Sequence, residues 1–375
     1  MKELFDNFKK KAKTFLKKLF LGPSLRDDLR FKVGLTKPEE KKSTHKVEIV
    51  SVKLEPHPNA DTLSIVRVFD GYTVVVKTSE WQGVNKAAYV QPDMVVPNNE
   101  QFAFLGGKTR IGAKRLRGIW SQGLLVPAPE NSRIGDDVSD LLGIVRYEPV
   151  DDPKIRTAGA KPPKGVFPIY DVENWYKFHS KLFEPGEEVA VHCKINGANG
   201  RFIFQNDKMH VGTHRTWKDF DKDCLWWRAL SQNLWIEIFC KLFPEYALYG
   251  EVFGDKVPNG NREMNYDARP GQYFVRIFDI WDVRQCRWLD LNEVGEVRKR
   301  FRILADGTDL IWVPLLFVGR HNEKTIREYA EGISAIANHI REGCVVRGIV
   351  ERNHLSYGRN CLKIVGNGYL AEKKR

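Results

Sequence analysis

Hydrophobic periodicity is lost between residues 129 and 165, and this interruption divides the chain into two parts. The segments 151–153 (Asp-Asp-Pro) and 161–165 (Lys-Pro-Pro-Lys-Gly) supply the proline and charge that are typical of a connection. A length of 375 residues also favours two or three domains. We therefore expect an extension over 1–42, a first domain over 43–128, a linker over 129–165 and a second domain over 166–375.

The first domain has the pattern of a small all-β barrel. Hydrophobic and polar side chains alternate over residues 47–53, 63–68 and 72–76, and Gly, Asn and Pro separate these runs. Short strands with frequent turns are typical of a barrel or sandwich of roughly 80–100 residues.

The second domain mixes helices with strands. Helical spacing occurs over residues 217–243, 291–304 and 323–341, and strand-like runs occur over 188–194, 201–205, 246–253, 273–281 and 344–351. Runs of strands interrupted by separate helices predict an α+β domain rather than a regular βαβ array.

The charge of the chain points to a polyanionic partner. Lys and Arg number 60 against 48 Asp and Glu, a net charge of +12, and residues 1–46 carry +8 of it. Apolar residues at three- and four-residue spacing before Gly22 predict a short basic amphipathic helix. That helix either packs on the rest of the protein or binds an anionic membrane or RNA.

Cysteine usage argues against a zinc site and against secretion. The six cysteines form no CxxC pair, and the nine His show no ligand spacing. Scattered cysteines without a secretory signal favour reduced thiols in the cytoplasm. No apolar run reaches the roughly 18–20 residues of a membrane span. We expect a cytoplasmic monomer that binds RNA and no membrane.

One lysine has the setting of a nucleophile. In the strand 189–194, alternation places His192 and Lys194 on the face opposite Cys193, and an Asn196-Gly197 turn follows at once. Such a lysine can approach a ligand closely, but it attacks only as a neutral amine.

Four further elements follow Lys194 in order. They are Glu251 between two glycines in an apolar strand, Phe278 followed by Asp279 in another, a Glu342-Gly343 pair at a strand entrance, and Lys363 in the last strand. Each alone would be a solvated strand end or an ion pair. Together, and in this order, they indicate one site.

This ordered set resembles the covalent nucleotidyltransferase superfamily of polynucleotide ligases and messenger-RNA capping enzymes. The resemblance implies an α+β nucleotidyltransferase (adenylyltransferase) domain over residues 166–375, preceded by an all-β OB-fold barrel and the basic N-terminal helix. It implies that Lys194 attacks the α-phosphate of a nucleotide to give lysyl-AMP. The other nucleotide-binding residues that it implies are Asn196, Gly197, Arg201, Glu251 (ribose), Phe278 (base), Glu342 and Lys363 (α-phosphate).

The metal implied by this resemblance is Mg2+ or Mn2+, held by Glu342 and Glu251. Magnesium keeps its water and takes only one or two carboxylates beside substrate phosphates, so few acids suffice. Three positions depart from the family pattern: Cys193, where many members have Glu; Asn196, where many have Asp or His; and Cys361, where many have Lys.

Two features favour an ATP-dependent RNA ligase within the superfamily. The segment 210–217 resembles the element that follows the first motif in RNA ligases, and it makes Arg215 a candidate RNA contact, with an ordinary basic loop as the alternative. Only 12 residues follow Lys363, too few for the C-terminal OB domain of DNA ligases and capping enzymes. The zinc element of NAD-dependent DNA ligases is also missing, so ATP is the expected cofactor.

The first domain has signatures of its own. Residues 56–63 and 116–125 are similar to the opening and closing signatures of the transfer-RNA-binding OB domain of some synthetase chains. Five basic residues between them suit an RNA backbone: Lys108, Arg110, Lys114, Arg115 and Arg117. Trp81 or Trp120 either stacks on bases or packs in the core.

The combination of an N-terminal OB module with a ligase core resembles one group of RNA ligases. That resemblance implies a phosphoric-ester-forming enzyme that joins 3′-OH and 5′-phosphate ends, at nicks in duplex RNA, through lysyl-AMP and 5′-adenylylated RNA. The alternatives are a GTP-dependent capping guanylyltransferase and a catalytically inactive RNA- or tRNA-binding protein.

Overall fold

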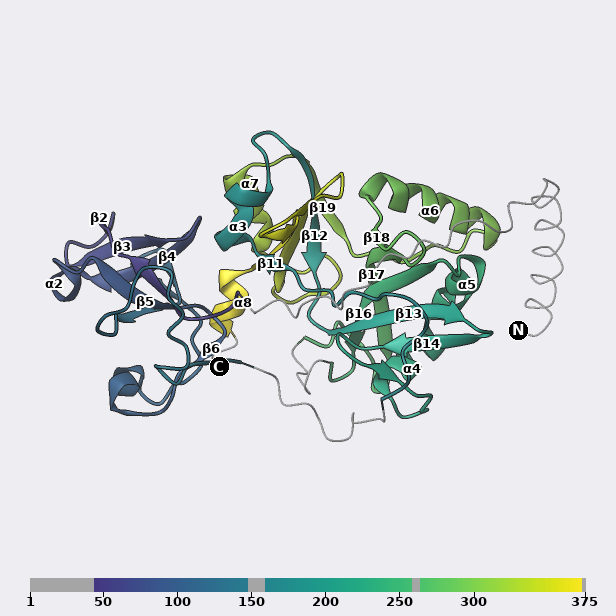
Figure 1. The fold of residues 1–375 in the computed structure, drawn as a ribbon, viewed down its shortest axis with the longest axis horizontal. Coiled ribbons are helices and arrows are strands. Elements are labelled where there is room, and N and C mark those ends of the chain that lie inside the picture. Colours follow the sequence, from purple (N-terminus) through teal and green to yellow (C-terminus); the bar gives the residue numbers. More distant parts are fainter. Residues whose placement is uncertain (1–43, 148–158, 258–263, 373–375) are drawn as a thin grey trace.

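The computed structural model describes residues 44–147, 159–257 and 264–372, which form two lobes in contact with each other (Figure 1). The basic helix expected within residues 1–42 lies outside the described residues. Among the described helices, none is long and apolar enough to cross a membrane.

The first lobe is built almost entirely from short strands. Its elements are β1 (Glu48–Ser51), β2 (Leu54–Pro56), β3 (Leu63–Val68), β4 (Tyr72–Lys77), α2 (Thr78–Trp81), β5 (Lys86–Val90), β6 (Met94–Val95), the 3-10 helix η1 (Glu100–Leu105), β7 (Ala113–Leu116), β8 (Ile119–Gln122), β9 (Leu124–Pro127) and β10 (Val145–Arg146).

These strands form the small barrel that the alternating sequence predicts. The antiparallel sheets β1-β5-β9 and β2-β3-β4 curve around one core, with the hairpin β7-β8 beside them. Val50, Val66 and Ala87 are buried in that core. Ile49 and Ala88 belong to a separate buried cluster that contains no residue of β2, β3 or β4. The prediction of an all-β OB-type barrel is confirmed.

The described parts of the expected linker, 129–147 and 159–165, contact the two lobes. The backbone amide of Ile49 bonds Asp136, and that of Val138 bonds Val47, so residues 129–147 pack on the barrel. On the other side, the Trp281 indole donates to the Val166 carbonyl, which fixes this stretch on the second lobe. Two apolar residues of this stretch, Val138 and Ile144, are buried, which accounts for the packing of 129–147 on the barrel.

The second lobe contains two mixed layers of strands and helices. Its elements are β11 (Glu173–Asn174), α3 (Trp175–Leu182), β12 (Glu188–Lys194), β13 (Ala198–Gln205), β14 (Lys208–Gly212), β15 (Trp217–Lys218), α4 (Leu225–Gln232), α5 (Trp235–Leu242), β16 (Tyr246–Gly254), β17 (Tyr273–Asp282), β18 (Arg287–Trp288), α6 (Leu291–Leu304), β19 (Leu315–Arg320), α7 (Glu323–Ala330), β20 (Gly343–Gly348), β21 (Asn353–His354), β22 (Gly358–Arg359), β23 (Cys361–Val365) and α8 (Asn367–Glu372).

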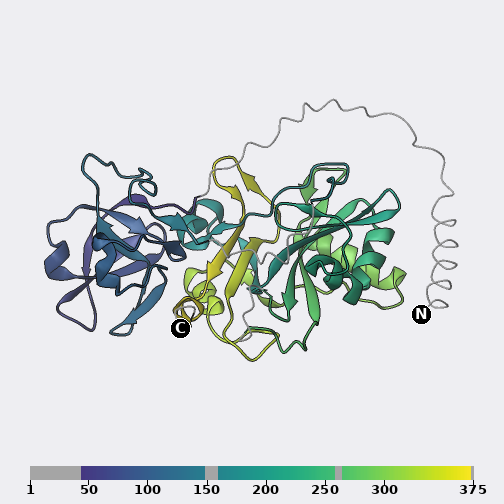
Figure 2. The ribbon, with the colours of Figure 1, turned by 90° about the horizontal axis from the view of Figure 1, so that it is seen from below.

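Two sheets organise this lobe. One has the strand order β11-β23-β20-β12-β19, and the other has the order β15-β14-β13-β16-β17-β18. Figures 1 and 2 show the first sheet next to the barrel and the second sheet farther from it. Helices α4, α5 and α6 lie beside the second sheet. The α+β class is therefore confirmed.

The helices are shorter than the sequence periodicity suggests, with one exception. Helix α6 spans residues 291–304 as expected, and a capping box between Asp290 and Glu293 fixes its start. The pattern over 217–243 divides into α4 and α5, because the Asn233 side chain bonds the Ala229 carbonyl and ends the first helix. Helix α7 stops at Ala330, just before a glycine with positive φ.

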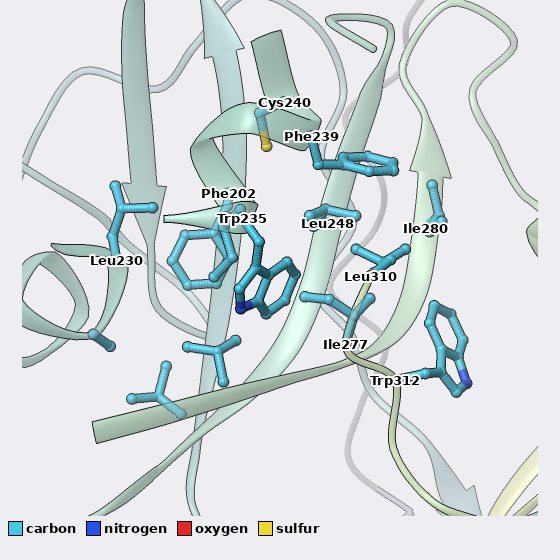
Figure 3. Packing of buried hydrophobic residues seen from close by; sticks show 14 of the residues in the cluster. Phe202, Leu230, Trp235, Phe239, Cys240, Leu248, Ile277, Ile280, Leu310 and Trp312 are labelled. Carbon is cyan, nitrogen blue, oxygen red and sulfur yellow. The ribbon is translucent and has the colours of Figure 1, made fainter. Parts of the chain in front are cut away.

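The main core of the second lobe lies between the six-stranded sheet and its helices. Figure 3 shows Phe202, Leu248 and Ile277 from three neighbouring strands against Trp235 and Phe239 of α5. Close packing of these large side chains holds β13, β16 and β17 in a fixed order. These three strands supply one wall of the site described below.

The two lobes share a second hydrophobic core. Tyr72 and Tyr89 of the barrel lie against Tyr176 of α3, with ring centroids 5.4 Å apart within the barrel pair and 5.0 Å apart between Tyr72 and Tyr176. At its edge, Lys177 Nζ is 2.8 Å from a Glu48 carboxylate oxygen across the boundary. Buried aromatic area of this kind holds the lobes as one body.

We predict that Tyr176→Ala destabilises both lobes. Removing a fully buried aromatic side chain leaves a cavity and costs about 3–5 kcal/mol. Urea unfolding followed by tryptophan fluorescence should show this loss in free energy of unfolding. The control is Leu355→Ala, whose side chain is completely exposed and whose truncation should change stability by less than about 0.5 kcal/mol. A Tyr176→Ala chain as stable as the control would contradict the shared core.

Candidate active site

The candidate site is a cavity of about 230 Å³ between the two sheets of the second lobe. One wall comes from β12, β20 and β23, through His192, Lys194, Val345, Arg347 and Lys363. The facing wall comes from β13, β16 and β17, through Asn199, Glu251 and Phe278. The structure therefore brings together the predicted lysine, acid and aromatic residues from strands far apart in the sequence.

Strand pairing places Glu342 next to Lys194. In the antiparallel ladder of β12 and β20, Lys194 lies opposite Gly343. The Lys194 Nζ and a Glu342 carboxylate oxygen are 2.8 Å apart. Gly343 has φ +153°, and a Cβ there would lie 1.9 Å from the Ile364 carbonyl oxygen, so only glycine fits.

A second glycine lets the facing sheet approach the lysine. A Cβ at Gly197 would lie 2.4 Å from the Val252 carbonyl oxygen and 2.8 Å from the Glu251 Cγ. Glycine at the Asn-Gly turn therefore allows β16 to pass directly beside the end of β12. That close passage brings Glu251 near Lys194.

The charges around Lys194 hold it as an ammonium ion. Burial lowers the pKa of Lys194, but Glu342 and Glu251 outweigh burial, and the pKa lies above its ordinary value. The lysine is thus paired and positioned before any nucleotide arrives, and it must lose its proton before it can attack.

Glu251 is the opposite case. Burial raises its pKa to about 8, although the positive charge of Lys194 acts against this. A carboxyl with that pKa carries its proton at neutral pH. Of the two acids beside the lysine, Glu342 is therefore its ion-pair partner at neutral pH. Glu251 becomes negatively charged only when it loses its proton.

Lys363 lies where it faces Lys194 from β23. Burial lowers its pKa, Asp171 opposes this, and the charge of Lys194 lowers the pKa further. Two lysines lining one small cavity form a positive surface that suits phosphate oxygens.

Phe278 and two residues missed by sequence reasoning complete the walls. The Phe278 ring packs on Tyr170, with centroids 4.6 Å apart. His192 is buried in the same wall, and burial, aided by the charge of Arg347, lowers its pKa to about 3, so it is neutral. The alternation in β12 placed His192 on the face of Lys194, a signal that could have identified it; Tyr170 has no comparable signal.

Asp279 is a structural member of the motif. Its fully buried carboxylate lies 3.2 Å from Arg347 of β20 and 2.7 Å from Arg359 of β22. These ion pairs tie β17 to the other sheet and fix the spacing of the two walls.

Arg201, Asn196 and Arg215 lie outside the cavity walls. The Arg201 guanidinium donates to the Thr213 carbonyl at 2.7 Å and covers the Trp217 ring at 4.6 Å. The Asn196 side chain accepts a bond from Tyr369 of α8. Arg215 is exposed on the turn between β14 and β15.

The basic loop of the barrel divides into two groups. Lys108, Arg110 and Lys114 line a groove in the barrel, and Arg110 is also 2.6 Å from an Asp93 carboxylate oxygen. Arg115 and Arg117 are exposed on the β7-β8 hairpin and do not line that groove. Trp81 and Trp120 are both partly buried.

A second cavity, of about 300 Å³, lies where the lobes meet. Barrel residues such as Asp93, Arg110 and Arg146 line it together with Lys194, Glu342 and Lys363. Figure 1 shows β6 of the barrel close to α8 at this boundary. The barrel therefore contributes side chains beside the motif residues, which no local sequence pattern indicated.

Glu251 and Glu342 are the side chains that suit a divalent cation. Within the described residues, no group of three or more His, Cys, Asp or Glu could hold a metal by itself. Two carboxylates are enough for magnesium, which takes one or two such ligands and completes its shell with water and substrate phosphates.

Fold and site together define a nucleotidyltransferase domain. Comparison with protein families agrees: residues 187–365 match the RNA ligase family, and residues 45–128 match a family described as an OB-fold domain. Residues 187–365, which make up most of the second lobe, are thus similar to the RNA ligase family.

Similarity to curated proteins is confined to a short region. Phenylalanine–tRNA ligase beta subunits match with 40% identity over 103 residues in Hahella chejuensis and 31% over 145 residues in Symbiobacterium thermophilum. These regions are 28% and 38% of this chain, which spans only 12% and 14% of those relatives.

Solved structures of Naegleria gruberi RNA ligase share the fold over most of the chain. A variant with ATP and Mn and a variant with AMP and Mn each give a TM-score of 0.71 at 24% identity. They cover 88% of this chain and 99% and 100% of theirs. The same ligase with PPi gives 0.71 at 23% identity, covering 89% of this chain and 100% of that one.

We predict that Glu251→Gln flattens the pH dependence of stability. The folded protein keeps the Glu251 proton up to about pH 8, whereas the unfolded chain releases it near pH 4.5. The contribution of Glu251 to the free energy of unfolding is therefore greatest below pH 4.5. It declines as the pH rises to about 8, by roughly 1.36 kcal/mol for each pH unit. Urea unfolding from pH 5 to 8 measures it.

The control is Glu130→Gln at an exposed position, which should follow the unmodified protein. Parallel curves for Glu251→Gln and the unmodified protein would contradict a buried, protonated Glu251.

Proposed function

We propose that this protein is an ATP-dependent RNA ligase that joins 3′-OH and 5′-phosphate ends, with nicks in duplex RNA as its substrate. The observation that carries the proposal is the convergence of five motif residues on two cavities that share Lys194 and Lys363. Glu251 and Phe278 line one of these cavities, and Glu342 lines the other. RNA is then the macromolecular partner, and we propose that the protein acts as a monomer.

ATP is the proposed nucleotide. The fold is shared with structures of a relative solved with ATP and Mn and with AMP and Mn. We propose that Phe278 stacks on the base, Glu251 holds a ribose hydroxyl and Lys363 contacts the α-phosphate. Their common position in the cavity that Lys194 lines supports these roles.

The first step forms a covalent bond to the protein. The Lys194 amine attacks the α-phosphorus of ATP, a P–N bond forms, the bond to the β-phosphate oxygen breaks, and pyrophosphate leaves. Before the attack, Lys194 must release the proton that Glu342 and Glu251 now favour. Positioning of the amine at the cavity wall lowers the entropic part of the barrier.

A divalent cation held by Glu251 and Glu342 would offset charge on the phosphates and on the two carboxylates. The chain's own contribution is to hold both acids within reach of Lys194. Glu251 would lose its proton when positive charge binds there, since its pKa of about 8 lies close to neutral pH.

Two further steps complete the proposed cycle. The 5′-phosphate of RNA attacks the AMP of lysyl-AMP, frees Lys194 and forms 5′-adenylylated RNA. The 3′-OH then attacks the adenylylated phosphate, a phosphodiester forms, and AMP leaves. The barrel, with its basic loop, and Arg215 are proposed RNA contacts because they are exposed and cationic.

We expect ATP and magnesium to add the mass of one AMP to the intact protein, with no RNA present. Lys194→Ala should abolish the adduct, because the nucleophile is removed, and pyrophosphate should reverse it. Lys53→Ala, an exposed lysine of the barrel, is the control and should label fully. Intact-protein mass spectrometry measures both.

Labelling by GTP and not by ATP would replace this proposal with RNA capping. No adduct with either nucleotide would leave an RNA-binding protein.

We also predict selective sealing of nicks whose 3′-OH strand is RNA at the break. Gel analysis of a labelled nicked duplex should show joined product and a transient 5′-adenylylated strand. Phe278→Ala should weaken apparent ATP affinity by tenfold or more, on the order of 1.4 kcal/mol. Equal sealing of an all-DNA nick would contradict RNA specificity.

A further inference from the structure

A third cavity belongs to neither wall of the active site. It is a groove of about 760 Å³ in the barrel, bounded by β4, α2, β5, η1, the basic loop and β9. The function proposed above uses only its basic rim, as an RNA contact, and assigns no role to its apolar interior.

The groove exists because the barrel is not closed by a backbone ladder at this point. Strand β4 pairs with β3 along one edge only. On its other edge, side chains take the place of a strand: the Val75 amide donates to Ser121 Oγ at 3.0 Å, and the Thr73 amide donates to Gln122 Oε1 at 3.3 Å. The wall therefore opens toward Lys77.

The inside of the groove is mainly apolar. Val74, Val76 and Leu125 line its buried part. At its mouth, Phe104 of η1 has 65% of its side chain exposed, although an aromatic ring of this size is normally covered. An exposed ring beside an apolar floor is a platform for a flat ligand.

The rim of the groove is positive. Lys77, Lys86, Lys108, Arg110 and Lys114 lie along it, against a single acid, Glu80, which is already paired with Lys77. Within the described residues, Lys108 and Lys114 form no ion pair. The occupant is therefore expected to carry several negative charges together with apolar surface.

We propose that this groove binds unpaired nucleotides of the RNA substrate, with a base stacked on Phe104 and phosphates on Lys108 and Lys114. Single-stranded RNA combines an exposed π-face on every base with one charge per nucleotide, which matches an apolar floor under a basic rim. In a duplex the bases are already stacked inside the helix, so their faces cannot reach Phe104. This inference rests on the proposed RNA substrate and adds that part of it is single-stranded.

The test is binding of a labelled single-stranded RNA of about 10 nucleotides, within the roughly 4–16-nucleotide site of one OB fold. Fluorescence anisotropy at several salt concentrations compares the unmodified protein with Phe104→Ala. We expect Phe104→Ala to weaken binding at least about fivefold, with the salt slope unchanged, because stacking is lost and phosphate contacts stay. Leu141→Ala, an exposed apolar residue of the same lobe, is the matched control.

A second pair of variants tests the rim. The double change Lys108→Ala and Lys114→Ala should lower the salt slope of log K by about 1.4, since each lost contact to a single strand contributes about 0.7. Lys53→Ala is the matched control. For a blunt RNA duplex, Phe104→Ala should bind as the unmodified protein does.

Unchanged single-strand binding in Phe104→Ala would overturn the proposal, as would equal weakening for the blunt duplex. Binding of an acidic peptide with no binding of RNA would also overturn it. AMP labelling of Lys194 is measured on Phe104→Ala and should be intact. A failure of that labelling in the unmodified protein would count against the ligase, and the anisotropy result would still decide the groove.

Discussion

The register between β12 and β20 is the constraint on which the site depends. Lys194 lies opposite Gly343, and Glu342 immediately precedes that glycine. The register therefore places the Glu342 carboxylate 2.8 Å from the Lys194 Nζ. A shift of one residue would turn Lys194 to the opposite face of the sheet. The alternation of the strand fixes the register, since Val189 and Val191 must face the buried core shared by the lobes.

The sequence was sufficient for the fold class and for the motif residues that meet in the cavity. Alternation predicted the barrel strands and β12, and helical spacing over 291–304 predicted α6. The order of Lys194, Glu251, Phe278, Glu342 and Lys363 indicated a single site through its resemblance to the motifs of covalent nucleotidyltransferases. The roles of these residues remain proposals to be tested by the variants above.

Other features depend on contacts between distant segments, so no local pattern could indicate them. Arg201 was expected to contact the nucleotide. It lies against the Trp217 ring instead, because β13 and β14 form a tight hairpin. Asp279 is held by arginines 68 and 80 residues away in sequence. The cavity between the lobes requires the barrel to dock on α3, which depends on tyrosines that are unremarkable in their own segments.

The tyrosine core between the lobes has a geometric consequence. Since Tyr72 and Tyr176 pack as if within one domain, the groove with Phe104 and the end of β12 cannot move apart freely. In the proposed complex, an RNA strand bound in the barrel groove would present to Lys194 a nucleotide whose position is set by the distance between the groove and Lys194. The place of the unpaired nucleotides relative to the break would be a property of the architecture, independent of the sequence of the RNA.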